Sequence, residues 1–284
     1  MAHMAQTTHE ACISFTLFIF VPQYNFQSEV KSIIKWLVRH VPRPVLIRFS
    51  YLFSFVFRIF YAGNRYECPV CGGRFRKLLP YGYGKKNTGN RLCPRCLSLE
   101  RHRLLWIFFR ETGFFSQPLK MLHIAPEQCF LKRFRRIQNL DYTTGDLESP
   151  IADIHFDIRQ IPLEDNVYDF VMCNHVLEHI DDEQKALREI MRILKPGGRA
   201  ILQVPLDYSR NETFEDDSVT GKKEREEIFG QYDHLRVYGT DYEQRLRRAG
   251  FLVDVNRFID TVDPVLRARY RLPETEWIYI CTKP

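Results

Sequence analysis

The sequence YDFVMCNHVLEHIDDEQKALREIMRILKPGGRAILQV, residues 168–204, decides the fold class. It opens on an apolar run, 168–174, of a length suited to a buried strand. A helical pattern follows over 182–194, where apolar side chains recur every three or four residues after an aspartate. Pro-Gly-Gly at 196–198 stops that helix, and a second apolar run begins at 199–204. This order predicts two parallel strands joined by a helix.

Further apolar runs flank this unit on both sides, with another helical pattern over 241–249. Short apolar runs that alternate with helical patterns are typical of a mostly parallel sheet covered on both faces. The sequence therefore predicts an α/β, Rossmann-like domain. The other expected strands are 120–125, 141–144, 152–156, 251–258 and 277–281.

The composition excludes the disordered and collagen-like classes, because 45% of the 284 residues are hydrophobic and 27% are charged. No uninterrupted run of about 18 apolar residues marks a membrane span, so we expect a mainly soluble globular protein. The net charge of +6 is unevenly distributed. Residues 26–110 hold 17 Lys and Arg against three Glu, whereas the residues after 110 hold 24 basic and 31 acidic side chains. The basic part suggests an anionic partner, nucleic acid or a membrane surface, although such a stretch is often only a solvated face.

Four of the eight cysteines form two C-x2-C pairs, Cys68 with Cys71 and Cys93 with Cys96. Together they supply a closed tetrahedral S4 set, which suits a structural Zn²⁺ and leaves no coordination position for substrate. Iron and four reduced cysteines without a metal are the alternatives. The other four cysteines are scattered, which indicates a reducing, cytoplasmic compartment.

Basic side chains and two tyrosines, Tyr81 and Tyr83, surround these cysteines. The mixture could bind nucleic acid through phosphate contacts and stacking, receive an anionic small substrate, or keep a small metal module soluble. A helix over 97–111 is expected to join this zinc-ribbon-like module to the sheet. We therefore divide the chain into a helical extension, 1–62, a zinc module, 63–111, and a sheet domain, 112–284.

Within residues 29–61 of the extension, a helical pattern ends at a break formed by Pro42 and Pro44, and the segment that follows, 45–61, is apolar almost all round. Such a helix must be covered. Either it packs on the rest of the protein or on a second subunit, or it lies in a membrane interface with its aromatic side chains among the acyl chains. The predicted location is accordingly cytoplasmic, with membrane association left open.

Ligands of open α/β sheets lie at the carboxyl ends of the strands. Two carboxylates that follow successive strands suit a nucleoside, since one accepts both ribose hydroxyls and the other lies near an adenine amine. The candidate cofactor-binding residues, which come at or just after the ends of the first four expected strands, are His123, Ala125, Pro126, Glu127, Asp146, Leu147, Asp157, Ile158, Asn174 and His175.

The stretch 151–205 resembles class I S-adenosylmethionine-dependent methyltransferases, notably those that act on small molecules. The resemblance rests on D-I-R-Q-I-P-L-E-D-N-V-Y-D-F-V from Asp157, on H-V-L-E-H from His175, and on L-K-P-G-G from Leu194. It implies a seven-stranded sheet with a reversed final hairpin and S-adenosylmethionine as cofactor. It also implies that Asp146 binds the ribose and that Asp157, with the backbone of Ile158, contacts the adenine.

The first loop departs from this family, which usually has a Gly-rich turn where this chain has His-Ile-Ala-Pro-Glu, 123–127. Ala125 is small enough to keep part of the close approach, and Glu127 could pair with the methionine ammonium group, beside Asn174 and His175. The four-cysteine module, the S-L-E-R-H-R segment at 98–103 and this loop together also look like an uncharacterised bacterial subgroup of the superfamily.

Methyl transfer from a sulfonium is an in-line displacement, so the protein mainly has to align donor and acceptor. A hydroxyl acceptor would be helped by a base, and His175, His179 and His234 are the candidates. Arg236 could hold an anionic group of the acceptor, or the loop around it could simply be pinned by its own polar residues. We expect a small-molecule or lipid- or glycan-linked acceptor; the alternatives are a nucleic-acid methyltransferase and a non-catalytic zinc scaffold.

Overall fold

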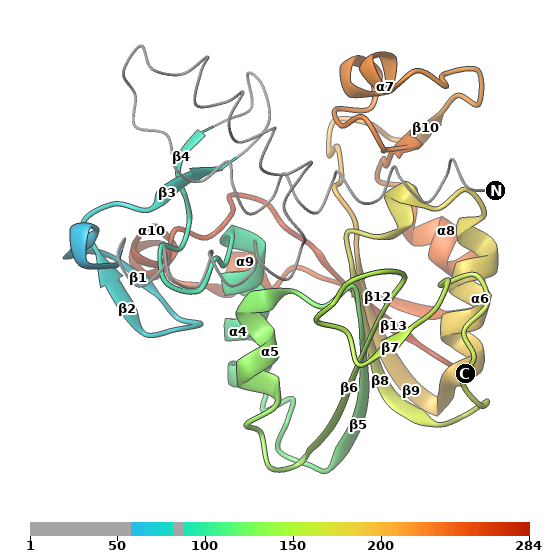
Figure 1. Cartoon of the computed structure of the whole chain (residues 1–284), viewed down its shortest axis with the longest axis horizontal. Helices are drawn as coiled ribbons and strands as arrows, with labels where there is room; N and C mark the ends of the chain where they lie inside the picture. The colour runs from blue at the N-terminus through green and yellow to red at the C-terminus, as the bar shows by residue number, and fades with distance from the viewer. Residues whose placement is uncertain (1–57, 82–87) are drawn as a thin grey trace. The chain divides into compact units, whose positions relative to one another are not determined.

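The computed structural model describes residues 58–81 and 88–284 (Figure 1). These residues form two compact units. The metal unit comprises residues 58–81, 88–107 and 262–273, and the sheet unit comprises residues 108–261 and 274–284. Residues 262–273, near the carboxyl terminus, therefore belong to the metal unit. The division predicted from the sequence, into three consecutive segments, places them in the sheet domain. The extension before residue 58, with most of the 29–61 pattern, lies outside the described residues.

The sheet unit is built on one seven-stranded sheet, in the order β12-β13-β9-β8-β5-β6-β7. Five strands from β9 to β7 are parallel, and β13 runs antiparallel to both β9 and β12. The predicted α/β sheet with a reversed final hairpin is confirmed. The strands are β5 (Leu119–Ile124), β6 (Leu140–Asp146), β7 (Ile154–His155), β8 (Tyr168–Asn174), β9 (Leu194–Gln203), β12 (Leu252–Asn256) and β13 (Ile278–Thr282).

The helix α6 (Glu183–Ile193) connects β8 to β9, as predicted from the 168–204 stretch. Asp182 caps it by accepting a hydrogen bond of 2.9 Å from the backbone N–H of Lys185. The other helices of this unit are α5 (Gln128–Phe134), η3 (Leu177–His179), α7 (Lys222–Ile228), α8 (Tyr242–Arg248) and α9 (Phe258–Thr261), and a short hairpin pairs β10 (Phe214–Glu215) with β11 (Arg236–Val237).

Both faces of the sheet are buried because alternate side chains of the central strands point in opposite directions. On one face, Leu122, Val171 and Leu202 belong to a core that includes the apolar side of α6. On the other face, Phe170 packs against Phe114 with ring centroids 4.6 Å apart, in a wider cluster of phenylalanines. The carboxyl ends of β5, β6, β7 and β8 therefore belong to a sheet that is packed on both faces.

The metal unit contains two short antiparallel pairs, the first part of one helix and the whole of another. The strand β1 (Ala62–Cys68) pairs with β2 (Gly73–Phe75), and β3 (Leu79–Tyr81) pairs with β4 (Thr88–Leu92). The helix α4 (Glu100–Glu111) begins in this unit and ends in the sheet unit, and α10 (Pro264–Tyr270) completes it. Among the residues described here, no helix has the length and hydropathy needed to cross a bilayer.

Candidate functional site

The loop after β5 begins with a left-handed residue, Ala125, whose φ is 51°. Its N–H donates to the carbonyl of Gly145 at the end of β6, at 2.8 Å, which holds the turn against the neighbouring strand. The chain then passes through Pro126 to Glu127, which precedes α5. A non-glycine residue in this conformation is uncommon, so the small Ala125 performs the turn that glycine performs in a Gly-rich loop.

His123 is fully buried and fixes the first loop from inside the sheet. Its Nδ1 lies 2.8 Å from the hydroxyl of Tyr142, on β6, and its Nε2 is paired with the Glu127 carboxylate. His123 therefore supports the site through Glu127 rather than facing a ligand. No sequence pattern singles out Tyr142, because a tyrosine in a strand is ordinary.

Glu127 is joined on its other side to Asn174, the last residue of β8. The Asn174 amide donates to Glu127 Oε1 at 3.0 Å. The carbonyl oxygen of this buried amide has no hydrogen-bond partner within the described residues. A buried acceptor without a partner is costly, and a ligand ammonium group could donate to it. Glu127 and Asn174 thus fit the methionine end of S-adenosylmethionine.

Asp146 ends β6 and shapes the loop that follows it. Its Oδ1 accepts two backbone N–H bonds, from Glu148 at 2.9 Å and from Ser149 at 2.7 Å. These bonds fix the carboxylate, and Oδ2 makes no hydrogen bond to any residue that the structure describes. The neighbouring Leu147 is an exposed large apolar side chain. A fixed carboxylate oxygen beside an exposed apolar surface fits a ribose and the edge of an adenine.

Asp157, the predicted adenine contact, already has a strong partner. Arg159 binds its carboxylate through Nε and Nη2, the latter at 2.6 Å, and binds Asp181 through Nη1 at 2.7 Å. The hydrogen bonds from Arg159 lower the pKa of Asp157. An adenine amine would have to share this carboxylate with Arg159, whereas the buried Ile158 supplies an apolar neighbour.

The three candidate bases gather around a carboxylate that the sequence analysis did not assign, Glu178. His175, with a left-handed φ of 55°, places its Nδ1 3.3 Å from Glu178 Oε1. The rings of His179 and His234 lie edge to face with centroids 4.9 Å apart. Burial raises the pKa of Glu178, but the hydrogen bond from His175 and the nearby histidines lower it to a net value of about 2. Burial also lowers the pKa of His234.

Arg236 is a structural residue, so the interpretation in which it holds an anionic substrate is wrong. It is buried, and its guanidinium donates to the carbonyls of Leu177 at 2.7 Å, Ile180 at 2.6 Å and Asp181 at 3.1 Å. These three carbonyls belong to η3 and the residues after it. The guanidinium thereby anchors the segment that carries Glu178 and His179.

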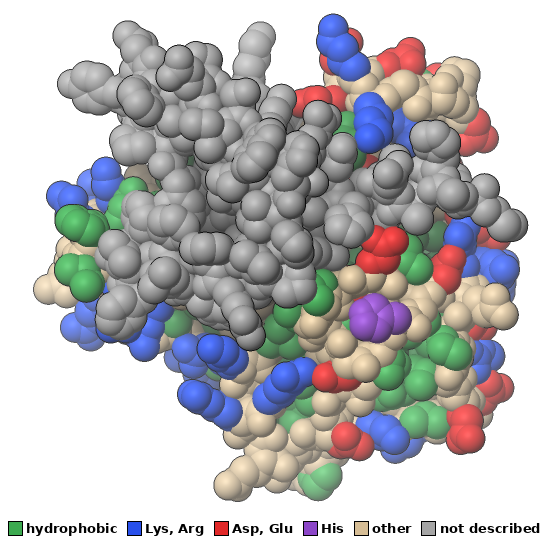
Figure 2. Space-filling view, viewed as in Figure 1, with side chains coloured by type: hydrophobic (Ala, Val, Ile, Leu, Met, Phe, Trp, Pro, Cys, Tyr) green, Lys and Arg blue, Asp and Glu red, His purple; other side chains and the backbone are tan. Residues whose placement is uncertain are grey.

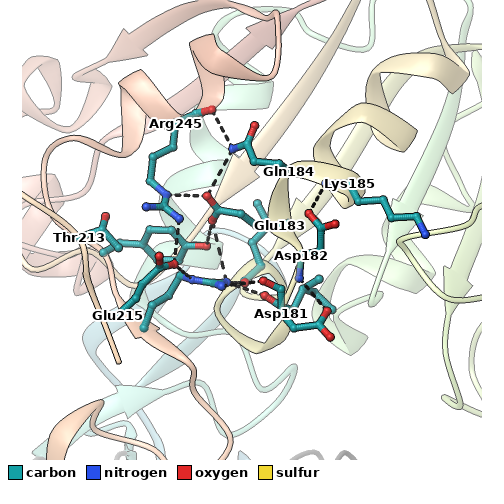
Figure 3. A network of polar contacts seen from close by, with 12 residues as sticks. Asp181, Asp182, Glu183, Gln184, Lys185, Thr213, Glu215 and Arg245 are labelled. Atoms are coloured by element: carbon teal, nitrogen blue, oxygen red, sulfur yellow. Dashed lines mark hydrogen bonds and ion pairs between the residues drawn. The ribbon is translucent and has the colours of Figure 1, made fainter. Parts of the chain in front are cut away.

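A network of ion pairs surrounds this clamp (Figure 3). Arg236 Nε is paired with Glu215, and Arg245 binds both Glu215, at 2.9 Å, and the buried Glu183, at 2.5 Å. Tyr238 donates to the second oxygen of Glu183 at 2.6 Å. The start of α6 and the β10–β11 hairpin are therefore held together by these ion pairs.

The four cysteines of the metal unit converge as their spacing predicts. All four sulfur atoms lie within 4.8 Å of one another, with Cys68 Sγ 3.6 Å from Cys96 Sγ and Cys71 Sγ 3.7 Å from Cys93 Sγ. A tetrahedral Zn²⁺ with Zn–S bonds of about 2.3 Å places its ligands about 3.8 Å apart. The sulfur positions fit such an ion.

Both cysteine turns have the same backbone. The N–H of Gly72 donates to the carbonyl of Cys68 at 2.8 Å, and the N–H of Leu97 donates to that of Cys93 at 3.0 Å. Gly72 and Leu97 each follow the second cysteine of their pair, and both have positive φ, 66° and 61°. This repetition indicates that the two turns are equivalent halves of one metal site.

Residues 120–202 match the methyltransferase domain family (Methyltransf_11). This match lies within the sheet unit and supports the class I S-adenosylmethionine-dependent methyltransferase domain that the motifs indicate. Over 57 residues the chain is 35% identical to a ubiquinone/menaquinone biosynthesis C-methyltransferase of Idiomarina loihiensis. These residues are 20% of this chain and 22% of that protein. Over 58 residues it is 40% identical to a demethylmenaquinone methyltransferase of Staphylococcus aureus, covering 20% of this chain and 24% of that protein.

The chain thus spans less than a quarter of the length of these two relatives. Among solved structures, it is similar to an S-adenosylmethionine-dependent methyltransferase from Mesorhizobium loti, with 15% identity and a TM-score of 0.44, over 63% of this chain and 96% of that one.

Proposed function

We propose that the protein is an S-adenosylmethionine-dependent methyltransferase. The observation that carries the proposal is the set of polar side chains at the carboxyl ends of β5, β6 and β8: Glu127 with Asn174 for the methionine end of the cofactor, and Asp146 for its ribose. The oxygen atoms that would accept from the cofactor, Asn174 Oδ1 and Asp146 Oδ2, have no partner among the described side chains and backbone. Bound there, S-adenosylmethionine would supply an activated methyl group.

The acceptor that we propose is a small molecule, free or linked to a lipid or glycan. The two relatives are named for quinone biosynthesis, which supports an acceptor with a ring that carries oxygen atoms. This chain would contribute alignment, because the activated methyl group needs only a nucleophile held in line with the sulfur–carbon bond.

We propose that the metal unit binds Zn²⁺ as a structural ion. The S4 ligand set supports this role, since four thiolates close the coordination sphere. The unit's basic side chains give limited support to the nucleic-acid alternative. Arg91 is paired with Glu100 at 2.7 Å and Arg74 lies 3.4 Å from Glu67. Over the sheet unit, basic and acidic side chains are interspersed on the face shown in Figure 2.

Calorimetric titration with S-adenosylmethionine tests the proposed function. Asp146→Ala removes the carboxylate and should weaken binding by about 100-fold, because two hydrogen bonds from ribose hydroxyls to a charged acceptor are lost. Asp146→Asn removes the charge but keeps an oxygen that can accept from the Ser149 N–H. This variant therefore shows whether weaker binding comes from the lost carboxylate or from a change in the loop. Asp217→Ala is a matched control on the exposed surface. An unchanged dissociation constant in both Asp146 variants, or no binding by the unaltered chain, would overturn the assignment.

A further inference from the structure

Three side chains of the sheet unit, which does not contain the four cysteines, place possible metal ligands close together. One ligand atom from each of Glu178, His179 and His234 lies within 4.8 Å of the other two. Glu178 and His179 belong to η3, whereas His234 comes from the segment before β11. That segment is held in place because the N–H of Leu235 donates to the carbonyl of Glu178 at 2.9 Å. The backbone therefore fixes the two halves of the cluster against each other.

The Glu178 carboxylate provides an independent indication of a missing ligand. Its side chain is 2% exposed, and Oε1 is engaged by His175. The other oxygen, Oε2, is buried and has no hydrogen-bond partner in the described part of the chain. A buried carboxylate oxygen without a partner lowers the stability of the fold, and it does so more than a buried neutral acceptor. A cation at Oε2 would remove that cost.

Asp233 provides oxygen acceptors for one ring nitrogen of His179. The His179 Nδ1 lies 3.2 Å from the Asp233 carbonyl oxygen and 3.4 Å from its Oδ2. A proton on Nδ1 donated to Asp233 leaves Nε2 with its lone pair available. Metal-binding histidines usually have such an oxygen acceptor behind the ring, which fixes the tautomer and raises the basicity of the ligand nitrogen.

The ligand set selects a class of metal ion. Two imidazole nitrogens and one carboxylate oxygen suit divalent transition metals such as Mn²⁺, Fe²⁺, Co²⁺ or Zn²⁺, and are unlike the all-oxygen sets of Mg²⁺ and Ca²⁺. Three protein ligands leave coordination positions for a water molecule or a substrate. The His179 side chain is partly exposed, so the cluster can be reached from solvent.

We propose that Glu178, His179 and His234 bind a divalent transition-metal ion, and that this ion binds a hydroxyl oxygen of the acceptor. The second part rests on the proposed methyltransferase function. A metal-bound hydroxyl releases its proton to solvent more readily, because the cation stabilises the oxyanion. The oxygen then forms a bond to the methyl carbon, the sulfur–carbon bond breaks, and its electron pair stays on sulfur as a neutral thioether. The acceptor class is therefore a phenol or alcohol, and the product is a methyl ether.

Mn²⁺ is the probe for this site, because it prefers nitrogen and oxygen ligands and competes poorly for a Zn²⁺-loaded cysteine site. Electron paramagnetic resonance of free Mn²⁺, titrated with the 284-residue chain loaded with only one Zn²⁺ per four-cysteine site, should show one bound Mn²⁺ per chain. Glu178→Gln and His234→Ala should each weaken this binding at least about tenfold. His155→Ala, which removes an exposed histidine of the same unit, is the matched control and should bind as the unaltered chain does.

Mn²⁺ binding that is absent, or equal in all variants, would overturn the proposed site. Far-ultraviolet circular dichroism shows whether each variant is folded, and if Glu178→Gln is not, His234→Ala carries the test. Titration of the same samples with S-adenosylmethionine separates the two proposals. A protein that binds Mn²⁺ but not the cofactor contradicts the proposed function alone, whereas one that binds the cofactor but not Mn²⁺ contradicts the metal site alone.

Discussion

Arg103→Met should loosen two separated segments of the metal unit together. Arg103 lies on α4 and is fully buried. Its guanidinium donates to the carbonyls of Arg91 at 3.0 Å and Ser98 at 2.8 Å, near the second cysteine pair. It also donates to those of Tyr270 at 2.6 Å and Arg271 at 2.7 Å, at the end of α10. Arg103 therefore joins residues 262–273 to the rest of the unit, together with the ion pair of 2.8 Å between Arg269 and Glu67.

The magnitude follows from these four bonds. A hydrogen bond from a charged donor contributes about 1.5–3 kcal/mol, so four of them give roughly 6–12 kcal/mol. Burial of the guanidinium costs several kcal/mol, which offsets part of this gain. Methionine fills most of the volume but leaves the carbonyls without a donor. We expect a net loss of about 3–5 kcal/mol, the range found when one partner of a buried charged interaction is removed.

Hydrogen exchange measured by mass spectrometry is the suitable assay, because it reports the opening of each segment separately. A loss of 3–5 kcal/mol corresponds to exchange that is faster by about 10²–10⁴-fold. Peptides from residues 88–107 and from 262–273 should both show it. Arg110→Met changes an exposed arginine of the same helix and is the control. Unchanged exchange over 262–273 in the Arg103 variant would refute the reasoning.

Two further predictions concern the sheet unit. Gly145→Ala should lower its free energy of unfolding by about 1–3 kcal/mol, because a Cβ there would overlap the ring of Phe156; an unchanged thermal midpoint would contradict this. Glu189 has a lowered pKa because Arg192 donates to it, and it also accepts from the Ile161 N–H at 2.8 Å. Its contribution to stability is therefore present above the unfolded-state pKa, near 4.3, and is lost as the pH falls below that, so Glu189→Gln should flatten the acid limb of the stability curve.

The sheet could be predicted from the sequence because its signal is periodic and local. The central strand expected over 168–174 has those bounds in the structure. The helix expected from Asp182 begins one residue later, at Glu183, and Asp182 caps it. The third strand, expected over 152–156, is shorter, Ile154–His155. Residues 152 and 153 precede the observed strand, and the Asp153 side chain accepts hydrogen bonds from the N–H and the hydroxyl of Thr144.

The histidine cluster could be predicted only in part. The candidates His175 and His179 follow a predicted strand, and His234 lies two residues before Arg236. That all three meet at Glu178 depends on hydrogen bonds such as that from Leu235 N–H to the Glu178 carbonyl. Backbone groups are the same at every residue, so such bonds leave no trace in a sequence pattern. Residues 262–273 are likewise joined to the metal unit through backbone carbonyls, those of Tyr270 and Arg271, so their place in that unit could not be predicted from the sequence.

The arginines show why charge counting overstated the case for an anionic partner. Residues 26–110 are strongly basic, but several of the guanidiniums described there have partners within the chain. Arg103 binds four carbonyls, Arg91 is paired with Glu100, and Arg95 donates to the carbonyl of Cys71 at 3.2 Å. The planar guanidinium group has five N–H donors, so it can donate to several backbone carbonyls that accept no hydrogen bond within a helix or sheet. Only basic side chains without such partners can add to a phosphate-binding surface, so the total charge of the segment is an upper limit on its attraction for nucleic acid.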